Sequence, residues 1–162
     1  MQFRKILVIT KVWLKPLKGL DMIDYKQSLG EEEKVIFLRA LLYILGVEKR
    51  ASDHNKNYLI RQADQIGFDQ KELKNIKKPK KADELAKELK TIADIRIKRF
   101  ILREMILLAV ADHELTDNEM TNIYEIGIKA GIKEEKINDF FLWAAQGLEW
   151  QLEGSRLIEK DI

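Results

Sequence analysis

Two stretches of the chain align without a gap: Leu38–Leu73, LRALLYILGVEKRASDHNKNYLIRQADQIGFDQKEL, and Leu102–Ile137, LREMILLAVADHELTDNEMTNIYEIGIKAGIKEEKI. We name the constant shift that carries Leu38 onto Leu102 the repeat offset. Four of the 36 aligned positions are identical in the two copies: Leu38, Arg39, Asp53 and Gly67. The register of apolar stripe, acidic turn, helix cap and terminal glycine agrees as well. Because a helical hairpin cannot bury its stripe alone, we expect the copies to pack face to face about a pseudo-twofold axis. The alternative is a chance likeness of two amphipathic hairpins.

Apolar residues elsewhere also recur at intervals of three and four, and alternation typical of a strand occurs only over Ile6–Thr10. This spacing is typical of amphipathic helices that bury one face each. The sequence therefore predicts an all-α fold, a bundle of about seven helices in two pseudo-symmetric halves. The predicted organisation has three parts: an N-terminal arm over residues 1–29, a helical domain over residues 30–150 and a C-terminal tail over residues 151–162.

The composition of the 162-residue chain excludes several classes of protein. It is 46% hydrophobic and 35% charged, with a mean hydropathy of −0.30. These values are typical of a globular protein, and no apolar run approaches the roughly 18 residues that a membrane-spanning helix needs. The absence of cysteine excludes disulfides, thiolate metal sites and cysteine nucleophiles. We expect a soluble, cytoplasmic domain.

The charge is distributed unevenly along the chain. Residues 1–90 carry 20 Lys and Arg against 13 Asp and Glu, whereas residues 91–162 carry 9 against 14. The basic residues are densest between Lys71 and Lys90, a segment with no aromatic side chain for base stacking and no arginine for reading base edges. We therefore expect a solvated connection there and no nucleic-acid partner.

The segment Ala111–Glu119, ADHELTDNE, joins two predicted helices and is rich in carboxylates. Asp112 falls near the end of the first of these helices, where the negative end of the helix dipole disfavours an acid by roughly 0.3–1 kcal/mol. Glu48 occupies the equivalent position in the first copy. An acid placed twice in an unfavourable field implies a compensating partner.

Two interpretations of this turn remain open. Hard oxygen ligands suit Ca²⁺, Mg²⁺ or Mn²⁺, so one interpretation is a divalent cation site. Its candidate ligands are Asp112, Glu114, Asp117 and Glu119, with Glu48 contributing across the pseudo-twofold axis. In the other interpretation the same residues only cap the next helix, and Thr116 with Glu119 fits a capping box.

The pattern Ala111-Asp112 through Thr116-x-x-Glu119, followed by Ala130-Gly131-Ile132, resembles the TerB-like family, named for tellurite resistance. The resemblance spans roughly Glu31 to Phe141. It implies an all-helical domain of two related halves, with metal bound at the acidic turn by Asp112 and Glu119. It also implies a cytoplasmic, non-enzymatic role through protein partners, in a stress-response or membrane-associated complex. The alternative is a metal-free helical adaptor or interaction domain with no ligand.

No arrangement of residues in the sequence indicates an enzyme. His54 and His113 each stand alone in a turn, where a histidine is usually exposed and idle, although His113 beside Glu114 could in principle transfer protons. We find no serine or cysteine nucleophile with a paired base and no glycine-rich phosphate loop. We therefore expect a protein without catalytic activity.

The two ends of the chain carry apolar residues whose role stays open. The basic and apolar segment Met1–Leu20 is an arm packed on the domain, an upstream extension of a chain that naturally starts at Met22, or a surface for a partner or an anionic membrane. Near the other end, Trp143 and Trp150 do not share one helical stripe with Phe140. We expect one of these tryptophans to be exposed at an interface, and a homodimer is among the partners considered.

Overall fold

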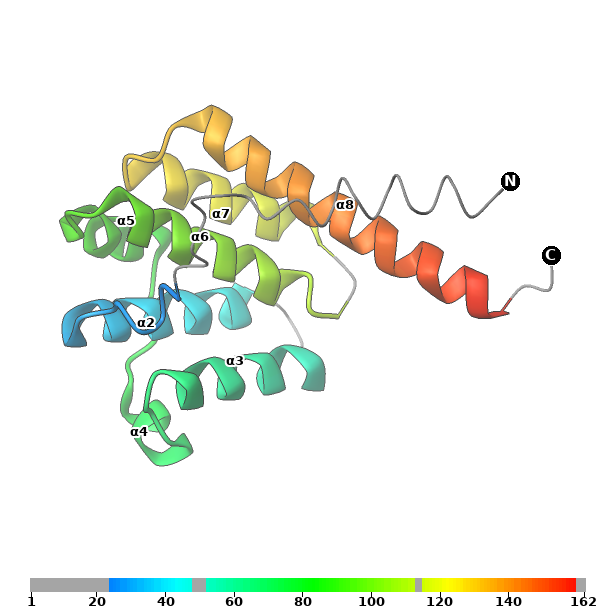
Figure 1. Cartoon of the computed structure of the whole chain (residues 1–162). Helices are drawn as coiled ribbons and strands as arrows, with labels where there is room; N and C mark the ends of the chain where they lie inside the picture. The colour runs from blue at the N-terminus through cyan, green and yellow to red at the C-terminus, as the bar shows by residue number, and fades with distance from the viewer. Residues whose placement is uncertain (1–23, 48–51, 113–114, 160–162) are drawn as a thin grey trace.

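The computed structural model describes residues 24–47, 52–112 and 115–159. Seven helices and no strand occur in these ranges (Figure 1), which confirms the predicted all-α bundle. The helices are α2 (Glu31–Val47), α3 (Asp53–Gln65), α4 (Gln70–Asn75), α5 (Ala82–Thr91), α6 (Ile95–Ala109), α7 (Asp117–Lys129) and α8 (Glu134–Glu159). The segment Ile6–Thr10 lies outside the described residues. Within the described part of the chain, no helix is both long enough and apolar enough to cross a membrane.

The helix bounds follow the repeat offset. The bounds of α3, shifted by this offset, are those of α7, and the first residues of α2 and α4 shift onto those of α6 and α8. The packing repeats as well: α2 packs against α6, α3 lies on both of them, and α7 lies on both of them from the other half. The structure therefore has the two pseudo-symmetric halves that the sequence predicts.

The ends of the equivalent helices are stabilised in the same way. Ser52 caps α3, its Oγ accepting a hydrogen bond of 3.2 Å from the backbone N–H of Asn55, and Thr116 caps α7 in the same manner. Both helices stop at a glycine in the left-handed region, Gly67 with φ of 88° and Gly131 with φ of 91°. A glycine adopts this conformation without the steric cost that a Cβ brings, so it ends a helix sharply.

The core lies between the two copies and is built from equivalent residues. Leu38 of α2 and its equivalent Leu102 of α6 are both fully buried. Leu59 of α3 is nearly fully buried, and its equivalent Ile123 of α7 is fully buried. Each such side chain contributes roughly 1.5–3 kcal/mol by leaving water. The described chain upstream of α2 joins this core, because Leu29 is buried in it.

The halves diverge after their third helix. In the first half α4 ends at Asn75, and the chain turns through Pro79 into α5, which packs against α2 and α7. In the second half Trp143 stands at the position equivalent to Pro79, and α8 continues without a break. Residues 151–159 of the predicted tail are thus helical, and the second half of α8 extends beyond the other helices (Figure 1). A proline disfavours a continuing helix and Trp143 does not, which accounts for the difference.

Candidate functional site

The acidic turn contains a capping box. Glu119, only 3% exposed, accepts hydrogen bonds through Oε2 from the backbone N–H of Thr116 at 2.8 Å and from its Oγ1 at 2.9 Å. The N–H of Glu119 donates in return to Thr116 Oγ1 at 3.2 Å. The capping interpretation is confirmed for these two residues, because the carboxylate of Glu119 serves to fix the start of α7.

Of the other predicted cation ligands, the structure describes Asp112 and Asp117. Asp117 is exposed in the first turn of α7, and Asp112 lies half-buried in the turn after α6. Glu48, His113 and Glu114 lie outside the described residues. Across the described ranges, no group of three or more His, Asp or Glu side chains is arranged to hold a metal ion. The cation site therefore stays a prediction.

His54 does not add a candidate site. His54 is exposed in the first turn of α3, the setting expected for a turn histidine without a special role. The helix that follows it begins with the Ser52 cap, so this part of the first copy has the same structural purpose as the acidic turn of the second.

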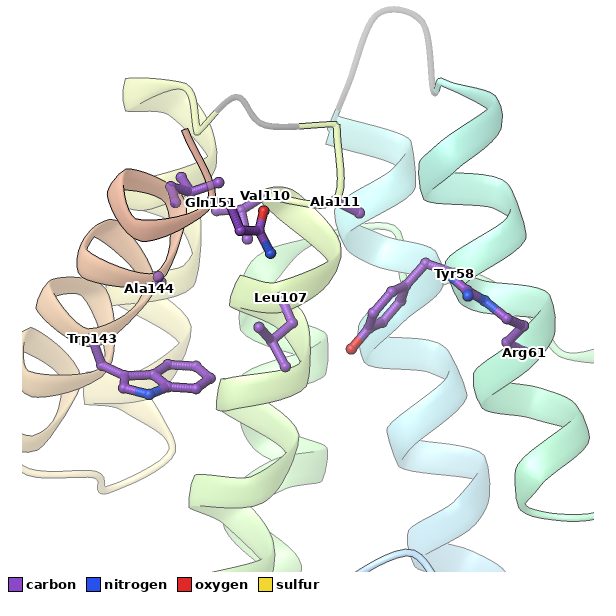
Figure 2. Close-up of a pocket in the computed structure, with 10 residues that line it drawn as sticks. Tyr58, Arg61, Leu107, Val110, Ala111, Trp143, Ala144 and Gln151 are labelled. Carbon is purple, nitrogen blue, oxygen red and sulfur yellow. The ribbon is translucent and has the colours of Figure 1, made fainter. Parts of the chain in front are cut away.

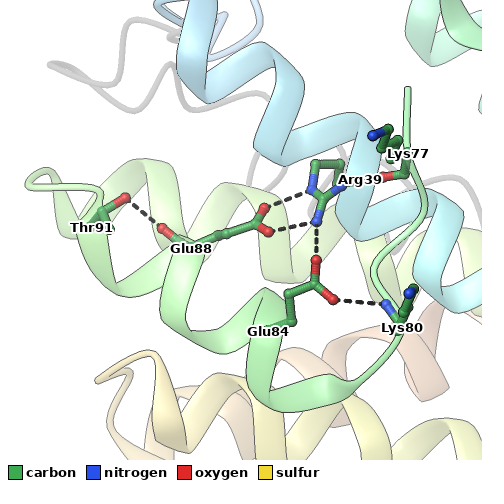
Figure 3. Close-up of polar contacts among 6 residues, drawn as sticks. All are labelled: Arg39, Lys77, Lys80, Glu84, Glu88 and Thr91. Atoms are coloured by element: carbon green, nitrogen blue, oxygen red, sulfur yellow. Dashed lines mark hydrogen bonds and ion pairs between the residues drawn. The ribbon is translucent and has the colours of Figure 1, made fainter. Parts of the chain in front are cut away.

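A different feature distinguishes the two halves, the groove in which α5 lies. Arg39 of α2, only 14% exposed, holds α5 from the side (Figure 3). Its Nη2 bonds Glu84 Oε1 at 2.6 Å and Glu88 Oε1 at 2.7 Å, and its Nε bonds Glu88 Oε2 at 2.8 Å. Arg39 also donates to the carbonyl of Lys77. The hydrogen bond with Glu88 is the main reason why the pKa of Arg39 is raised above its usual value.

The apolar side of α5 fills the floor of this groove. Leu85, Ala86 and Leu89 are buried against the neighbouring helices, α2 and α7. On the α7 side, Lys129 Nζ pairs with Asp83 at 2.6 Å, and this exposed pair lowers the pKa of Asp83 through its hydrogen bond. The groove thus holds an amphipathic helix through a leucine stripe, with two ion pairs to Arg39 on one side and one to Lys129 on the other.

In the second half, the equivalent groove holds no such helix from the part of the chain that the structure describes. Along α2, Arg39 and Gly46 contact α5 and the segment that leads into it, and the repeat offset maps them onto Arg103 and Val110 of the second half. Tyr43, between them, donates to Asn122 of α7 at 3.0 Å and maps onto Leu107. No helix within the described ranges covers this face of α6 as α5 covers α2. Two hollows lie along it.

The larger hollow, about 370 Å³, lies between α3, α6 and α8. Tyr58 of α3 and Trp143 of α8 lie on either side of Leu107 (Figure 2). Its lining residues are Tyr58, Arg61, Leu107, Val110, Ala111, Trp143, Ala144, Gly147, Leu148 and Gln151.

A second hollow of about 260 Å³ continues along the same face of α6, because Arg103 and Leu107 are one helical turn apart. Its lining residues are Tyr25, Arg96, Arg99, Phe100, Arg103 and Phe140. We call the two hollows together the trough. It is mostly apolar at one end and arginine-rich at the other.

A buried carboxylate holds two of the residues that line the trough. Glu104, 2% exposed, accepts a hydrogen bond of 2.7 Å from the hydroxyl of Tyr58 and one of 2.7 Å from Nη2 of Arg103. Burial, followed by the charge of Glu104, raises the pKa of Tyr58 above its usual range. The guanidinium of Arg103 also lies 5.2 Å from the ring centroid of Phe100, a cation–π distance. These contacts fix Tyr58 and Arg103 as the walls of the trough.

Both tryptophans that the sequence analysis singles out are exposed, Trp143 to 47% and Trp150 to 79%. Trp143 borders the trough, whereas Trp150 lies on the projecting half of α8. The sequence analysis did not identify the trough, although the alignment of Arg39 with Arg103 was the signal that leads to it.

No protein-family model matches the chain, and comparisons with curated proteins and with solved structures give no match. The resemblance to the TerB-like family therefore stays a prediction.

Proposed function

We propose that this protein is a non-enzymatic interaction module that binds a helix of a protein partner in the trough. The observation that carries the proposal is the pair of equivalent grooves, one filled by α5 and the other without such a helix among the described residues. The proposal corresponds to the metal-free adaptor considered in the sequence analysis. Its setting in a stress-response assembly stays a prediction from the family resemblance.

The contacts of α5 indicate what kind of segment fits such a groove. The helix buries Leu85, Ala86 and Leu89, which lie at the spacing of one helical face. Leu107 and Trp143 offer a comparable apolar floor and wall in the trough. Burial of a helical stripe in a preformed apolar groove is a recurrent mode of protein recognition, and large aromatic side chains at its edge usually supply much of the affinity.

The lining of the trough favours binding over chemistry. The described residues that line the two hollows include no histidine, serine, cysteine or aspartate, the side chains that most often act as nucleophile or base. The buried carboxylate of Glu104 is engaged by Tyr58 and Arg103. The arrangement supplies shape, apolar surface and positive charge.

A selection experiment tests the proposed function. A displayed library of helices with a fixed leucine stripe and variable flanks is selected against the full chain. We expect enriched helices to lose at least about tenfold in affinity on Leu107→Glu, since a buried carboxylate opposes an apolar contact by well over about 1.4 kcal/mol. Leu142→Glu is the matched control, because Leu142 is 61% exposed on α8 and does not line the trough. Enriched helices that bind both variants equally would refute the proposal.

A further inference from the structure

We infer that the helix bound in the trough is acidic, with two carboxylates one turn apart that pair with Arg103 as Glu84 and Glu88 pair with Arg39. The inference rests on the proposed function and specifies the chemistry of its partner. Its first support is equivalence: at the repeat offset, Arg103 occupies the position of the arginine that holds α5.

Arg103 has the capacity for this pairing. It is 36% exposed at the edge of the trough, and its Nε and Nη2 are directed to Glu104. Its Nη1 makes no hydrogen bond to a residue that the structure describes. A guanidinium presents five N–H donors in a planar fork, so the remaining donors can take a carboxylate from a bound helix while Glu104 keeps its own bonds.

Arg99 gives a second, independent observation. Its Nε is buried beside the trough and has no hydrogen-bond partner among the described residues. Leaving a buried charged donor unpaired is costly, and an incoming carboxylate would remove that cost. Arg61 adds a further positive charge at the opposite end of the trough. By contrast, Arg96 is already paired with Asp94 at 2.8 Å.

The charge of the trough also decides between candidate occupants. Residues 1–23 of this chain carry five Lys and Arg and one Asp. Such a segment would bring like charges against Arg99 and Arg103, which is unfavourable where water is partly excluded. An acidic helix meets no such opposition, and α5 itself, with Asp83, Glu84 and Glu88, is an example of the required pattern.

Peptide titrations of the isotope-labelled full chain, followed by NMR, test the inference. The first probe is a stapled helix with the sequence of residues 82–92, which carries the leucine stripe and both glutamates of α5 and is net acidic. The second has Glu84→Gln and Glu88→Gln, and the third has the sequence of residues 1–20. Because α5 is tethered beside its own groove at a high effective concentration, the added peptides are directed to the trough. We expect signal changes at Leu107 and Gly147 and not at Tyr43.

We expect the glutamate peptide to bind at least about tenfold more tightly than the glutamine peptide, since glutamine cannot make the charge-assisted hydrogen bonds that a carboxylate makes with a guanidinium. Arg103→Gln should abolish this preference, while Arg156→Gln, at an exposed arginine of α8 outside the trough, should preserve it. If Arg103→Gln does not fold, the comparison of peptides on the native chain still decides.

The outcomes separate this inference from the function on which it rests. Equal affinity of the glutamate and glutamine peptides at the trough would overturn the inference and leave helix binding intact. Tighter binding of the peptide with residues 1–20 would also overturn it and would favour the N-terminal segment as occupant. If no peptide binds the trough and the library selection yields no Leu107-dependent helix, both proposals are wrong.

Discussion

Gly67 and Gly131 allow the internal repeat to be tested by two equivalent substitutions. Both residues end a helix with positive φ, 88° and 91°, and a Cβ added at either would meet no atom within 4 Å. Collision therefore contributes nothing to the effect of alanine. The left-handed conformation costs a residue with a Cβ about 1–2 kcal/mol. Alanine offsets about 0.4–1 kcal/mol of this by restricting the unfolded chain.

Gly67→Ala and Gly131→Ala should each lower the free energy of unfolding by about 1 kcal/mol. The assay is denaturant unfolding of the full chain, and at this chain length the same effect lowers Tm by about 2–4 °C. Gly147→Ala is the matched control, because Gly147 lies within α8 and also has nothing within 4 Å of its added Cβ. Alanine there should stabilise the helix by about 0.5–1 kcal/mol.

The prediction requires the two turns to respond alike. The residue after each glycine makes the same hydrogen bond back to the helix. Phe68 N–H donates to the carbonyl of Ala63 at 2.9 Å, and Ile132 N–H donates to the carbonyl of Gly127 at 3.0 Å. A cost that differs between the two variants by more than about 1 kcal/mol would refute the reasoning, because it exceeds the roughly 0.3–0.5 kcal/mol within which effects at independent sites usually add. A neutral effect at both sites would refute the conformational argument itself.

Three further predictions concern the turn and the lining of the trough. Thr116→Ala should lower the free energy of unfolding by about 1–2 kcal/mol in denaturant unfolding, because it removes the cap of α7 and the Oγ1 partner of the buried Glu119. Folding raises the pKa of Tyr58 above its unfolded value of about 10, so its contribution to stability is present below that pH and is lost as pH rises further. Tyr58→Phe should therefore flatten the alkaline loss of stability, and in the native chain a tyrosine should resist ionisation, measured by tyrosinate absorbance, until unfolding. Calorimetric titration with Ca²⁺, Mg²⁺, Mn²⁺ or Zn²⁺ should give no binding heat, given the engagement of Glu119 in its cap; heat that disappears in an Asp112→Asn, Glu119→Gln variant would instead establish the cation site.

The sequence predicts the helices well because the information that specifies them is local. The apolar spacing, the hydroxyl caps at Ser52 and Thr116 and the glycines at Gly67 and Gly131 each act within one or two turns. Because the same local pattern occurs twice, each helix boundary is indicated by two stretches of sequence. The repeat offset, read from the sequence, then gives α7 the bounds of α3 without any knowledge of packing.

The functional site is harder to predict because it depends on contacts between distant segments. Thr116 and Glu119 satisfy both a capping box and the oxygen chemistry of a cation site, so only the direction of the carboxylate distinguishes them. The trough is defined by α3, α6 and α8 together, and its recognition needs the location of α5 in the other half. Pro79, which aligns with Trp143 at the repeat offset, indicates where the halves diverge. It does not indicate which helices the diverging segments pack against.

The substitutions between the two grooves are consistent with two different occupants. Gly46 lies directly beneath the side chain of Lys78, and a Cβ at residue 46 would collide with Nζ of that lysine. The atoms involved are the far end of a flexible side chain, which can move aside, so the glycine marks a close approach and not a requirement. The equivalent residue in the trough is Val110, whose branched side chain leaves less room for the same approach. A helix supplied by a separate chain and lying along α6 does not need that approach.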